Sequence, residues 1–257
     1  MFLKAILCAV SAAAIGVTSL ILNLTVSDEV VSAPISWGLG HHGNETVPTV
    51  PGGSEELLKK YDGMFRWDTN EKKVYFTFDL GYEAGYTGEV LDILDKNGIK
   101  ATFFLCGNYL QNADLINRMI AGGHNIGNHT DKHKDLPTLS DDGIRTDIGT
   151  FQKDYLAAFP GAKVPVYFRP PQGRIDERTL KIAKGEGLKT VMWSVAIRDW
   201  AKTPIEAKPN AEKIASRVHP GAIILMHITN AGTPRMIEEL LPLIAEKGYT
   251  VECLPRN

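Results

Sequence analysis

The sequence is poor in cysteine, carries no excess charge of either sign, and contains no short-period repeat or low-complexity tract. Three cysteines in 257 residues exclude a scaffold built on disulfides. Lys and Arg number 28 against 30 for Asp and Glu, and a net charge of -2 excludes the strongly basic face that binds nucleic acid. Hydrophobic residues make up 44% of the chain and charged residues 23%, which excludes wholesale disorder and a coiled-coil rod.

A long apolar run, residues 5–26, follows Lys4 near the start of the chain. This pattern is typical of an export signal, and the small residues Val31 and Ala33 suit a cleavage site. We therefore expect residues 1–33 to be a signal peptide. Because about 20 apolar residues can span a membrane, an uncleaved N-terminal anchor is the alternative. In both cases the rest of the chain is expected to be exported, either secreted or anchored on the outer face of the membrane.

Residues 34–73 differ in composition from the rest and are expected to form an irregular N-terminal extension. They are rich in Gly, Pro, His and Asn, and the only regular element indicated is a short helix over residues 54–61. The adjacent His41 and His42 lie in a glycine-rich stretch, where they are expected to be solvated loop residues rather than metal ligands.

From residue 74 onward, short apolar segments alternate with amphipathic ones. Strands are expected at residues 74–79, 101–106, 124–128, 166–169, 189–195, 222–227 and 249–254. Helices are expected at residues 86–97, 114–121, 141–159, 176–186, 210–218 and 234–247. Repeated strand and helix units predict an α/β fold of parallel strands with helical crossovers, either a barrel or a doubly wound sheet. This pattern alone does not separate the two.

Polar side chains of catalytic types stand at the C-terminal ends of the expected strands or just beyond them. They are Asp79, His129, Arg169, Asp199 and His227. A parallel barrel gathers its active site at this end of its strands, so we expect the five side chains to converge on one mouth.

Each of these residues also has a plain structural interpretation. His129 and His133 are four residues apart and can bind one metal ion if the segment turns helically, but isolated histidines at this spacing are usually surface or capping residues. Asp79 is either a base near the metal, with its charge held by an Arg, or a helix N-cap or turn-stabilising Asp. Arg169, held rigidly by the two prolines that follow it, is the candidate partner, and an ordinary surface Arg is the alternative.

His227 and Asp199 form the second half of the expected site. His227 emerges from a buried strand and suits proton donation near neutral pH, unless it is a satisfied core histidine. Asp199 is either a hydrogen-bond partner that keeps His227 cationic or a plain loop acid. Trp200 offers an apolar wall for an acyl methyl group or a sugar face. Taken together, the residues describe a hydrolytic site.

Five short motifs resemble, in order, those of the NodB-type polysaccharide deacetylases, also called carbohydrate esterase family four. They are TFDLG at residues 77–81, HTDKH at 129–133, RPPQG at 169–173, RDW at 198–200 and LMH at 225–227. The resemblance covers roughly residues 74–251. Within the family, the chain looks closest to the spore-cortex N-acetylmuramic acid deacetylases that form muramic delta-lactam, through residues 37–38, 58–63 and 78–83.

The resemblance implies a distorted (β/α) barrel over residues 74–257 and hydrolysis of N-acetyl groups on amino sugars of peptidoglycan glycan strands, with release of acetate. It implies Asp79 as general base, Arg169 as its charge partner, His227 as general acid, Asp199 as the residue that tunes it, and His129 and His133 as ligands of a divalent metal, zinc in the first place. Tyr82, Gln172 and Trp200 are expected to bind substrate, and the backbone N–H near Gln172 to stabilise the oxyanion. The location implied is the cell wall or spore cortex. An N-acetylglucosamine or chitin-type deacetylase and a metal-poor carbohydrate-binding pseudoenzyme are the alternatives, and the sequence indicates no oligomeric state.

Three positions depart from the family pattern. Leu80 stands where most members carry a second Asp as the third metal ligand, so the metal is expected to bind weakly, to recruit an oxygen from Asp79, substrate or water, or to differ in identity. Gln172 stands where the family often has Tyr, which is expected to change the groove more than the activity. Ala196 stands where many members have Asp, and nothing in the sequence explains it.

Overall fold

The fold is built around one curled sheet whose strand pairs are all parallel. In the computed structural model, residues 33–40, 43, 45–201 and 203–256 are described. The sheet order is β7-β5-β4-β3-β2-β9-β8, and β10 pairs with β2 beside this path. The strands are β2 (Lys73–Leu80), β3 (Thr102–Leu105), β4 (Asn125–Asn128), β5 (Tyr167–Phe168), β7 (Lys189–Thr190), β8 (Val195–Ala196), β9 (Ala222–His227) and β10 (Thr250–Glu252).

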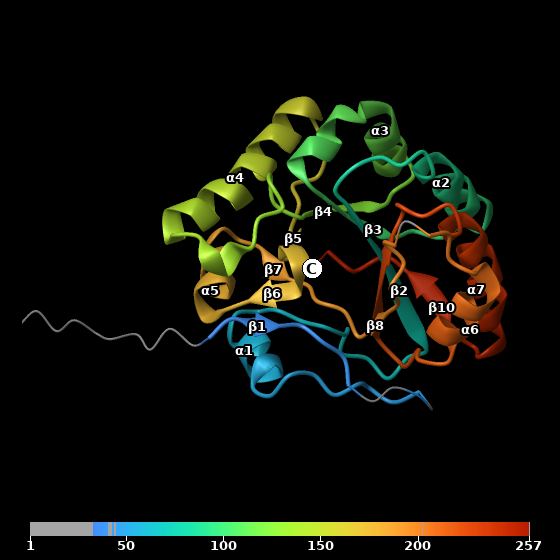
Figure 1. Cartoon of the computed structure of the whole chain (residues 1–257). Coiled ribbons are helices and arrows are strands. Elements are labelled where there is room, and N and C mark those ends of the chain that lie inside the picture. The colour runs from blue at the N-terminus through green and yellow to red at the C-terminus, as the bar shows by residue number, and fades with distance from the viewer. Residues whose placement is uncertain (1–32, 41–42, 44, 202, 257) are drawn as a thin grey trace, which may run out of the picture. The chain divides into compact units, whose positions relative to one another are not determined.

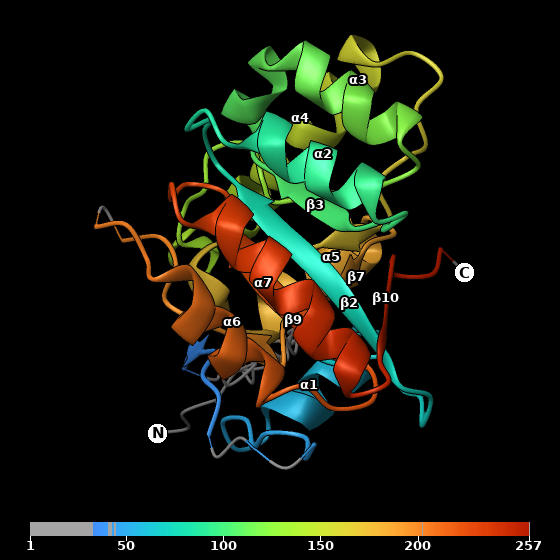
Figure 2. The ribbon, with the colours of Figure 1, turned by 90° about the vertical axis from the view of Figure 1, so that its right-hand side faces the viewer.

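Helices connect the strands and cover the outer face of the sheet, as Figures 1 and 2 show. They are α1 (Ser54–Lys60), α2 (Thr87–Lys96), α3 (Ala113–Ala121), α4 (Asp141–Ala158), α5 (Glu177–Gly185), α6 (Ala207–Ala215) and α7 (Thr233–Glu246), with short 3₁₀ turns η1 (Gly107–Gln111), η2 (Leu136–Thr138) and η3 (Pro171–Gly173). The expected helices agree with these within a few residues. No helix among the described residues is long and apolar enough to cross a membrane.

The side chains of strand β2 point alternately to the two faces of the sheet. Phe76, Phe78 and Leu80 belong to the main hydrophobic core, which also contains buried residues of α2, α3, α6 and α7. The intervening side chains of a strand point to the opposite face. There Tyr75 joins a second core inside the barrel, and Asp79, at the C-terminal end of the strand, lines a cavity.

The expectation of one strand over residues 189–195 is wrong, and the difference shows how the sheet closes. The segment forms two short strands: β7 pairs with β5 at one end of the sheet, and β8 pairs with β9 at the other end. Between them, Met192 donates to the carbonyl of Met64, and Ser194 donates to the carbonyl of Ile223. The chain therefore crosses from one edge of the curled sheet to the other. A distorted (β/α) barrel, one of the two architectures left open by the pattern, is confirmed.

The described residues before β2 pack along the barrel. Strand β1 (Ile35–Ser36) pairs antiparallel with β6 (Arg174–Ile175), and β-bridges join Met64 to Val191 and Arg66 to Ala222. The short helix expected over residues 54–61 is present as α1. The expected signal or anchor segment and the pair His41 and His42 lie outside the described residues.

The C-terminal tail closes the end of the barrel opposite to the cavity. Leu254 is buried in the inner core, and its carbonyl accepts a hydrogen bond from Asn125 at the start of β4. The Tyr167 hydroxyl, at the start of β5, donates to the carbonyl of Pro255. Side chains thus fill the barrel at the end that the tail closes, and the opposite end opens into the cavity.

Candidate active site

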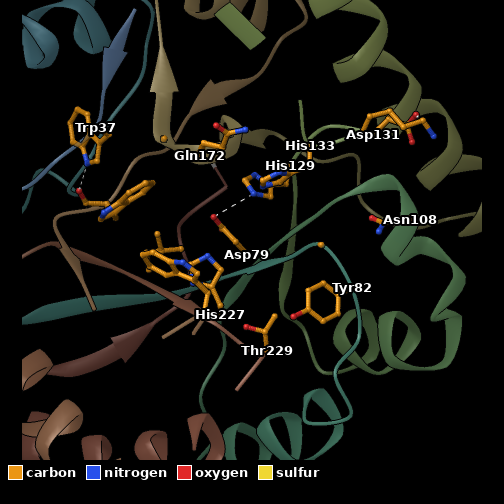
Figure 3. Close-up of a pocket in the computed structure, with 16 residues that line it drawn as sticks. Trp37, Asp79, Tyr82, Asn108, His129, Asp131, His133, Gln172, His227 and Thr229 are labelled. Carbon is orange, nitrogen blue, oxygen red and sulfur yellow. Dashed lines mark hydrogen bonds and ion pairs between the residues drawn. The ribbon is translucent and has the colours of Figure 1, made fainter. Parts of the chain in front are cut away.

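A cavity of about 910 Å³ opens at the carboxyl ends of the strands and collects the expected side chains (Figure 3). Its walls include Asp79, Tyr82, His129, His133, Gln172, Trp200 and His227. Arg169 and Asp199 are fully buried side chains that contact the cavity residues Asp79 and His227. The structure therefore brings all nine sequence-predicted site residues into one place.

The strand register sets Asp79 beside His227. The two residues are direct partners across the parallel pair of β2 and β9, in which neighbouring strands lie about 4.8 Å apart. Both stand at the last position at which β2 and β9 pair, so both side chains can reach the cavity. A carboxylate and an imidazole on adjacent strands can act on the same bound molecule, one as base and the other as acid.

Arg169 fixes the Asp79 carboxylate from behind. Its Nη1 donates to Asp79 Oδ1 at 2.8 Å and to Thr77 Oγ1 at 3.0 Å. Its remaining N–H groups donate to the carbonyls of Val191 and Met192 at 2.9 and 3.2 Å. The guanidinium also lies over the Phe104 ring at 4.2 Å. Arg169 is therefore a buried cation with four hydrogen bonds and not a surface residue.

These contacts decide the charge of Asp79. Burial raises the pKa of the Asp79 carboxyl, but the charges of Arg169, His129 and His227 and the hydrogen bond from Arg169 outweigh it, so the pKa lies below its ordinary value. Asp79 is ionised at neutral pH. Because Oδ1 is held by Arg169, Oδ2 is the oxygen left for chemistry.

His129 presents an unprotonated nitrogen to that oxygen. Its Nδ1 donates to the carbonyl of Arg169 at 2.8 Å, which places the lone pair of the neutral ring on Nε2. Burial lowers the pKa of His129 to about 4, more than the Asp79 charge raises it, so the ring is neutral at neutral pH. Nε2 then lies 3.6 Å from Asp79 Oδ2.

The loop from His129 to His133 brings the second imidazole beside the first, with ring centroids 5.0 Å apart. The helical turn that would place both histidines on one side of the segment is absent. Thr130 and His133 instead take left-handed backbone angles, with φ of 68° and 53°. Side chains hold them there: the Thr130 N–H donates to Asn128 Oδ1, and the His133 N–H donates to Thr130 Oγ1. Asp147 on α4 accepts from the N–H of Lys132 and fixes the middle of the loop.

His129 and His133 offer imidazole nitrogens, which are donors that divalent cations such as zinc bind. An imidazole lone pair and a carboxylate oxygen that face each other at 3.6 Å repel unless a positive charge lies near both, and burial also lowers the pKa of His133, so it too offers a neutral nitrogen. The ligand set is incomplete, because no group of three or more His, Cys, Asp or Glu side chains in the described ranges is arranged to hold a metal ion.

Leu80 cannot complete this set. It is fully buried in the main core and does not line the cavity, whereas its neighbours Asp79 and Gly81 do. An apolar side chain at this position is drawn toward the helices by the hydrophobic effect. The residue that departs from the family pattern therefore also points away from the site.

His227 is held in the orientation of a proton donor. Asp199 Oδ1 accepts from His227 Nδ1 at 2.8 Å, and Oδ2 accepts from the His227 backbone N–H at 2.7 Å. Burial lowers the pKa of His227, but the hydrogen bond and charge of Asp199, with the charge of Asp79, outweigh it, so the pKa lies above its ordinary value. Trp200 packs edge-on against the ring at 5.5 Å. Nε2 is left to face the cavity.

The rim and one wall contain residues of several origins. Tyr82 and Trp200 are each 55% exposed and offer aromatic surface at the mouth. Trp37 and Trp193 also line the cavity, and neither was among the expected site residues. Trp37 stands in the irregular segment far before the motifs, and although residues 37–38 contribute to the resemblance to the spore-cortex deacetylases, nothing in the sequence indicates that Trp37 lines the cavity.

Comparison with known proteins agrees with this geometry. The family model described as polysaccharide deacetylase matches residues 66–191. A peptidoglycan-N-acetylmuramic acid deacetylase of Bacillus subtilis, PdaA, is 35% identical over 230 residues, 89% of this chain and 87% of its own. The structure of that family 4 carbohydrate esterase superposes with a TM-score of 0.80 over 86% of this chain and 94% of the other. A peptidoglycan-N-acetylglucosamine deacetylase of Bacillus cereus is 34% identical over 195 residues, 73% of this chain and 89% of its own.

The chain therefore belongs to the polysaccharide deacetylase family, whose members are hydrolases that act on the amide bond of acetylated sugars. Enzymes of this family generally depend on a metal ion.

Proposed function

We propose that this chain is an exported deacetylase that removes the acetyl group from N-acetylmuramic acid residues of peptidoglycan, a step that leads to muramic delta-lactam in the spore cortex. The similarity to an N-acetylmuramic acid deacetylase over 89% of the chain supports this substrate. The observation that carries the proposal is the register pair of Asp79 and His227 at a single cavity, in which Arg169 holds the Asp79 carboxylate and Asp199 holds the His227 ring.

In the proposed reaction Asp79 acts as general base. Its free Oδ2 takes a proton from the water that attacks the acetyl carbonyl carbon, while Arg169 keeps the carboxylate in place through Oδ1. The resulting tetrahedral carbon carries a negative oxygen. The backbone N–H of the turn at Gln172, which lines the cavity, is the proposed donor to that oxygen.

His227 acts as general acid in the second step. Its Nε2 gives a proton to the sugar nitrogen as the carbon–nitrogen bond breaks, so that acetate leaves and the amine stays on the sugar. Asp199 holds Nδ1 and keeps the ring in the orientation and charge state this transfer needs. Trp200 supplies the apolar surface beside the reacting group.

His129 and His133 are the proposed ligands of a divalent ion, zinc in the first place, and the chemistry that such an ion supplies is polarisation of a carbonyl oxygen and a lower pKa for water. The glycan strand is proposed to lie across the mouth between Tyr82 and Trp200, near Gln172.

The test is acetate release by the protein from peptide-stripped glycan strands, from intact peptidoglycan and from chitin oligomers, before and after chelation and return of metal. Asp79→Asn removes the proposed base, and Asp92→Asn makes the same change on an exposed helix residue as a control. We expect release from muramic acid residues, lost on chelation and in Asp79→Asn and retained in Asp92→Asn. Release that survives chelation would refute the proposed metal dependence.

N-acetylglucosamine is the second candidate substrate, because the chain is 34% identical to a peptidoglycan-N-acetylglucosamine deacetylase. Mass spectrometry of the digested strands shows which sugar has lost its acetyl group. Deacetylation only of glucosamine would replace the first proposal with this one. If a folded, metal-supplied protein released acetate from none of the glycans, the carbohydrate-binding pseudoenzyme would become the first hypothesis.

Export is proposed from residues 1–33 alone. Fractionation of producing cells tests it. The full chain is expected in the medium or on the outer face of the membrane, and a chain that lacks residues 1–33 is expected to stay in the cytoplasm. Equal distribution of the two would contradict it.

A further inference from the structure

The first strand of the described chain is tied to a turn that forms part of the cavity wall. β1 pairs antiparallel with β6 through Ile35↔Ile175 and Ser36↔Arg174. The pairing continues by one residue, because the Trp37 N–H donates to the carbonyl of Gly173 at 2.8 Å. The backbone of residues 35–37 therefore runs along the segment that leads out of the cavity wall.

The turn that β1 reaches has an uncommon conformation. Gln172 and Gly173 both have positive φ, 60° and 65°, and the Arg174 N–H donates back to the carbonyl of Pro171. Positive φ at both central positions is the signature of a type I′ turn. A residue with a side chain at such an angle, like Gln172, costs on the order of 1 kcal/mol or more and persists only where its surroundings hold it. Both turn residues line the cavity.

The Trp37 side chain packs against this turn and restricts its movement. Its indole is buried, its Nε1–H donates to the carbonyl of Trp193 at 3.0 Å, and its ring contacts those of Phe65 and Trp193. A Cβ placed on Gly173 would lie 3.2 Å from the Cβ of Trp37 and 2.7 Å from the Trp193 ring. Two tryptophans thus pack against Gly173, and the turn has no room to move toward them.

We propose that Trp37, with strand β1, is a positioning element of the active site that holds the turn at Gln172 in its catalytic shape. The inference rests on the proposed function, in which a backbone N–H of this turn faces the developing oxyanion. It assigns a part in catalysis to a residue outside the segment 66–191 that the family model covers.

The test compares three variants of the full chain. Trp37→Ala removes both the ring and the hydrogen bond to Trp193, whereas Trp37→Phe keeps an aromatic ring. Trp67→Ala is the matched control: Trp67 lies in the same N-terminal segment and packs on Tyr75, but it lines a different cavity. Circular dichroism and thermal melting confirm that each variant is folded.

We expect Trp37→Ala to lower kcat/KM for acetate release by about ten- to a hundredfold, with most of the loss in kcat, because misplacement of a catalytic group by as little as 1 Å has effects of this size. Trp37→Phe is expected to recover most of the activity, and Trp67→Ala to retain wild-type kcat. Wild-type kcat in folded Trp37→Ala, or an equal loss in Trp67→Ala, would overturn the proposal.

Hydrogen–deuterium exchange gives a readout that does not depend on activity. The amides of residues 172–175 are expected to exchange faster in Trp37→Ala than in the wild type and Trp67→Ala. Unchanged exchange would also overturn the proposal. If the wild type released no acetate from any glycan, the proposed function would fail, and this measurement would still decide whether Trp37 holds the turn.

Discussion

At the scale of single residues, the buried pair of Asp79 and Arg169 is the strongest constraint in the site. The Arg169 side chain is inaccessible to solvent and donates to one carboxylate, one hydroxyl and two carbonyls. A buried ion pair does not need to stabilise a protein relative to an apolar pair, but the loss of one partner leaves an uncompensated charge. The stability of the fold and the proposed chemistry therefore both depend on the Asp79 carboxylate.

We predict that Arg169→Met lowers the free energy of unfolding by about 3 to 5 kcal/mol, because it leaves the Asp79 charge buried without its partner. Arg118→Met is the control, since Arg118 pairs with Asp92 at the surface, where such a pair contributes about 1 kcal/mol or less. Urea denaturation of both variants measures the difference. Equal losses would show that the buried pair has no special role in stability.

Asp199 gives a prediction about pH. His227 must be protonated to act as an acid, so kcat/KM is expected to be high below its pKa and to fall as the pH rises through it. Asp199 helps to raise this pKa above its ordinary value, against burial and the charge of Arg169. Asp199→Asn is therefore expected to move the alkaline limb of the kcat/KM profile to lower pH, while Asp92→Asn leaves it in place. A limb that does not move would mean that His227 is not the group that titrates.

Residue types at strand ends were enough to find most of the site. Asp79, His129 and His227 could be named because catalytic side chains directly follow apolar strands. The direction of Leu80 and the role of Trp37 could not be named, because they depend on contacts across the fold. The pleat of β2 turns the Leu80 side chain into the core. Trp37 contacts residues far along the chain because β1 pairs with β6.

At the scale of elements, strand β4 supports the site through a glycine, Gly127, which leaves room for a neighbouring aromatic ring. A Cβ on Gly127 would lie 2.5 Å from the ring of Phe104, which in turn lies under the guanidinium of Arg169. The glycine thus lets an aromatic ring cross β4 at a distance that no other residue allows. Gly149, in the middle of α4, has no atom within 4 Å of its added Cβ.

We predict opposite effects for the same substitution at these two glycines. Gly127→Ala is expected to lower the free energy of unfolding by about 1 to 3 kcal/mol, because the methyl group displaces Phe104. Gly149→Ala is expected to raise it by about 0.5 to 1 kcal/mol, because alanine reduces the freedom of the unfolded chain and favours helix. Denaturant melts of the two variants check both signs, and a Gly127→Ala variant as stable as the wild type would contradict the packing of β4.

Long periodic elements were predictable and the closure of the barrel was not. The helices and the strands β2 and β9 follow clear apolar patterns and were placed within a few residues. Strands β7 and β8 have two residues each, too few for a pattern, and the segment between them is apolar because it crosses the interior. An apolar run does not reveal whether it pairs with one edge of a sheet or with both.

At the scale of the whole molecule, the end of the barrel opposite to the cavity is closed by the tail after β10. We predict that Leu254→Ala lowers the free energy of unfolding by about 2 to 5 kcal/mol, as expected for a fully buried leucine, without changing kcat/KM of the folded enzyme. Val164→Ala is the control, because Val164 is half exposed and its loss should change stability by less than about 0.5 kcal/mol. Loss of activity in folded Leu254→Ala would show that the two ends of the barrel are coupled.

The pairing of β2 with β9 and β10 limits how far the protein can fold while it is being synthesised on the ribosome. Among the described strands, β2 is one of the first to be synthesised, and two of its three partners, β9 and β10, are the last. Contacts between distant parts of a chain form slowly, because a long loop must close before they contribute. The nascent chain therefore cannot complete its barrel, or bring Asp79 to His227, until β9 and β10 have been synthesised. Until then the main hydrophobic core stays incomplete, because residues of β9 and α7 belong to it.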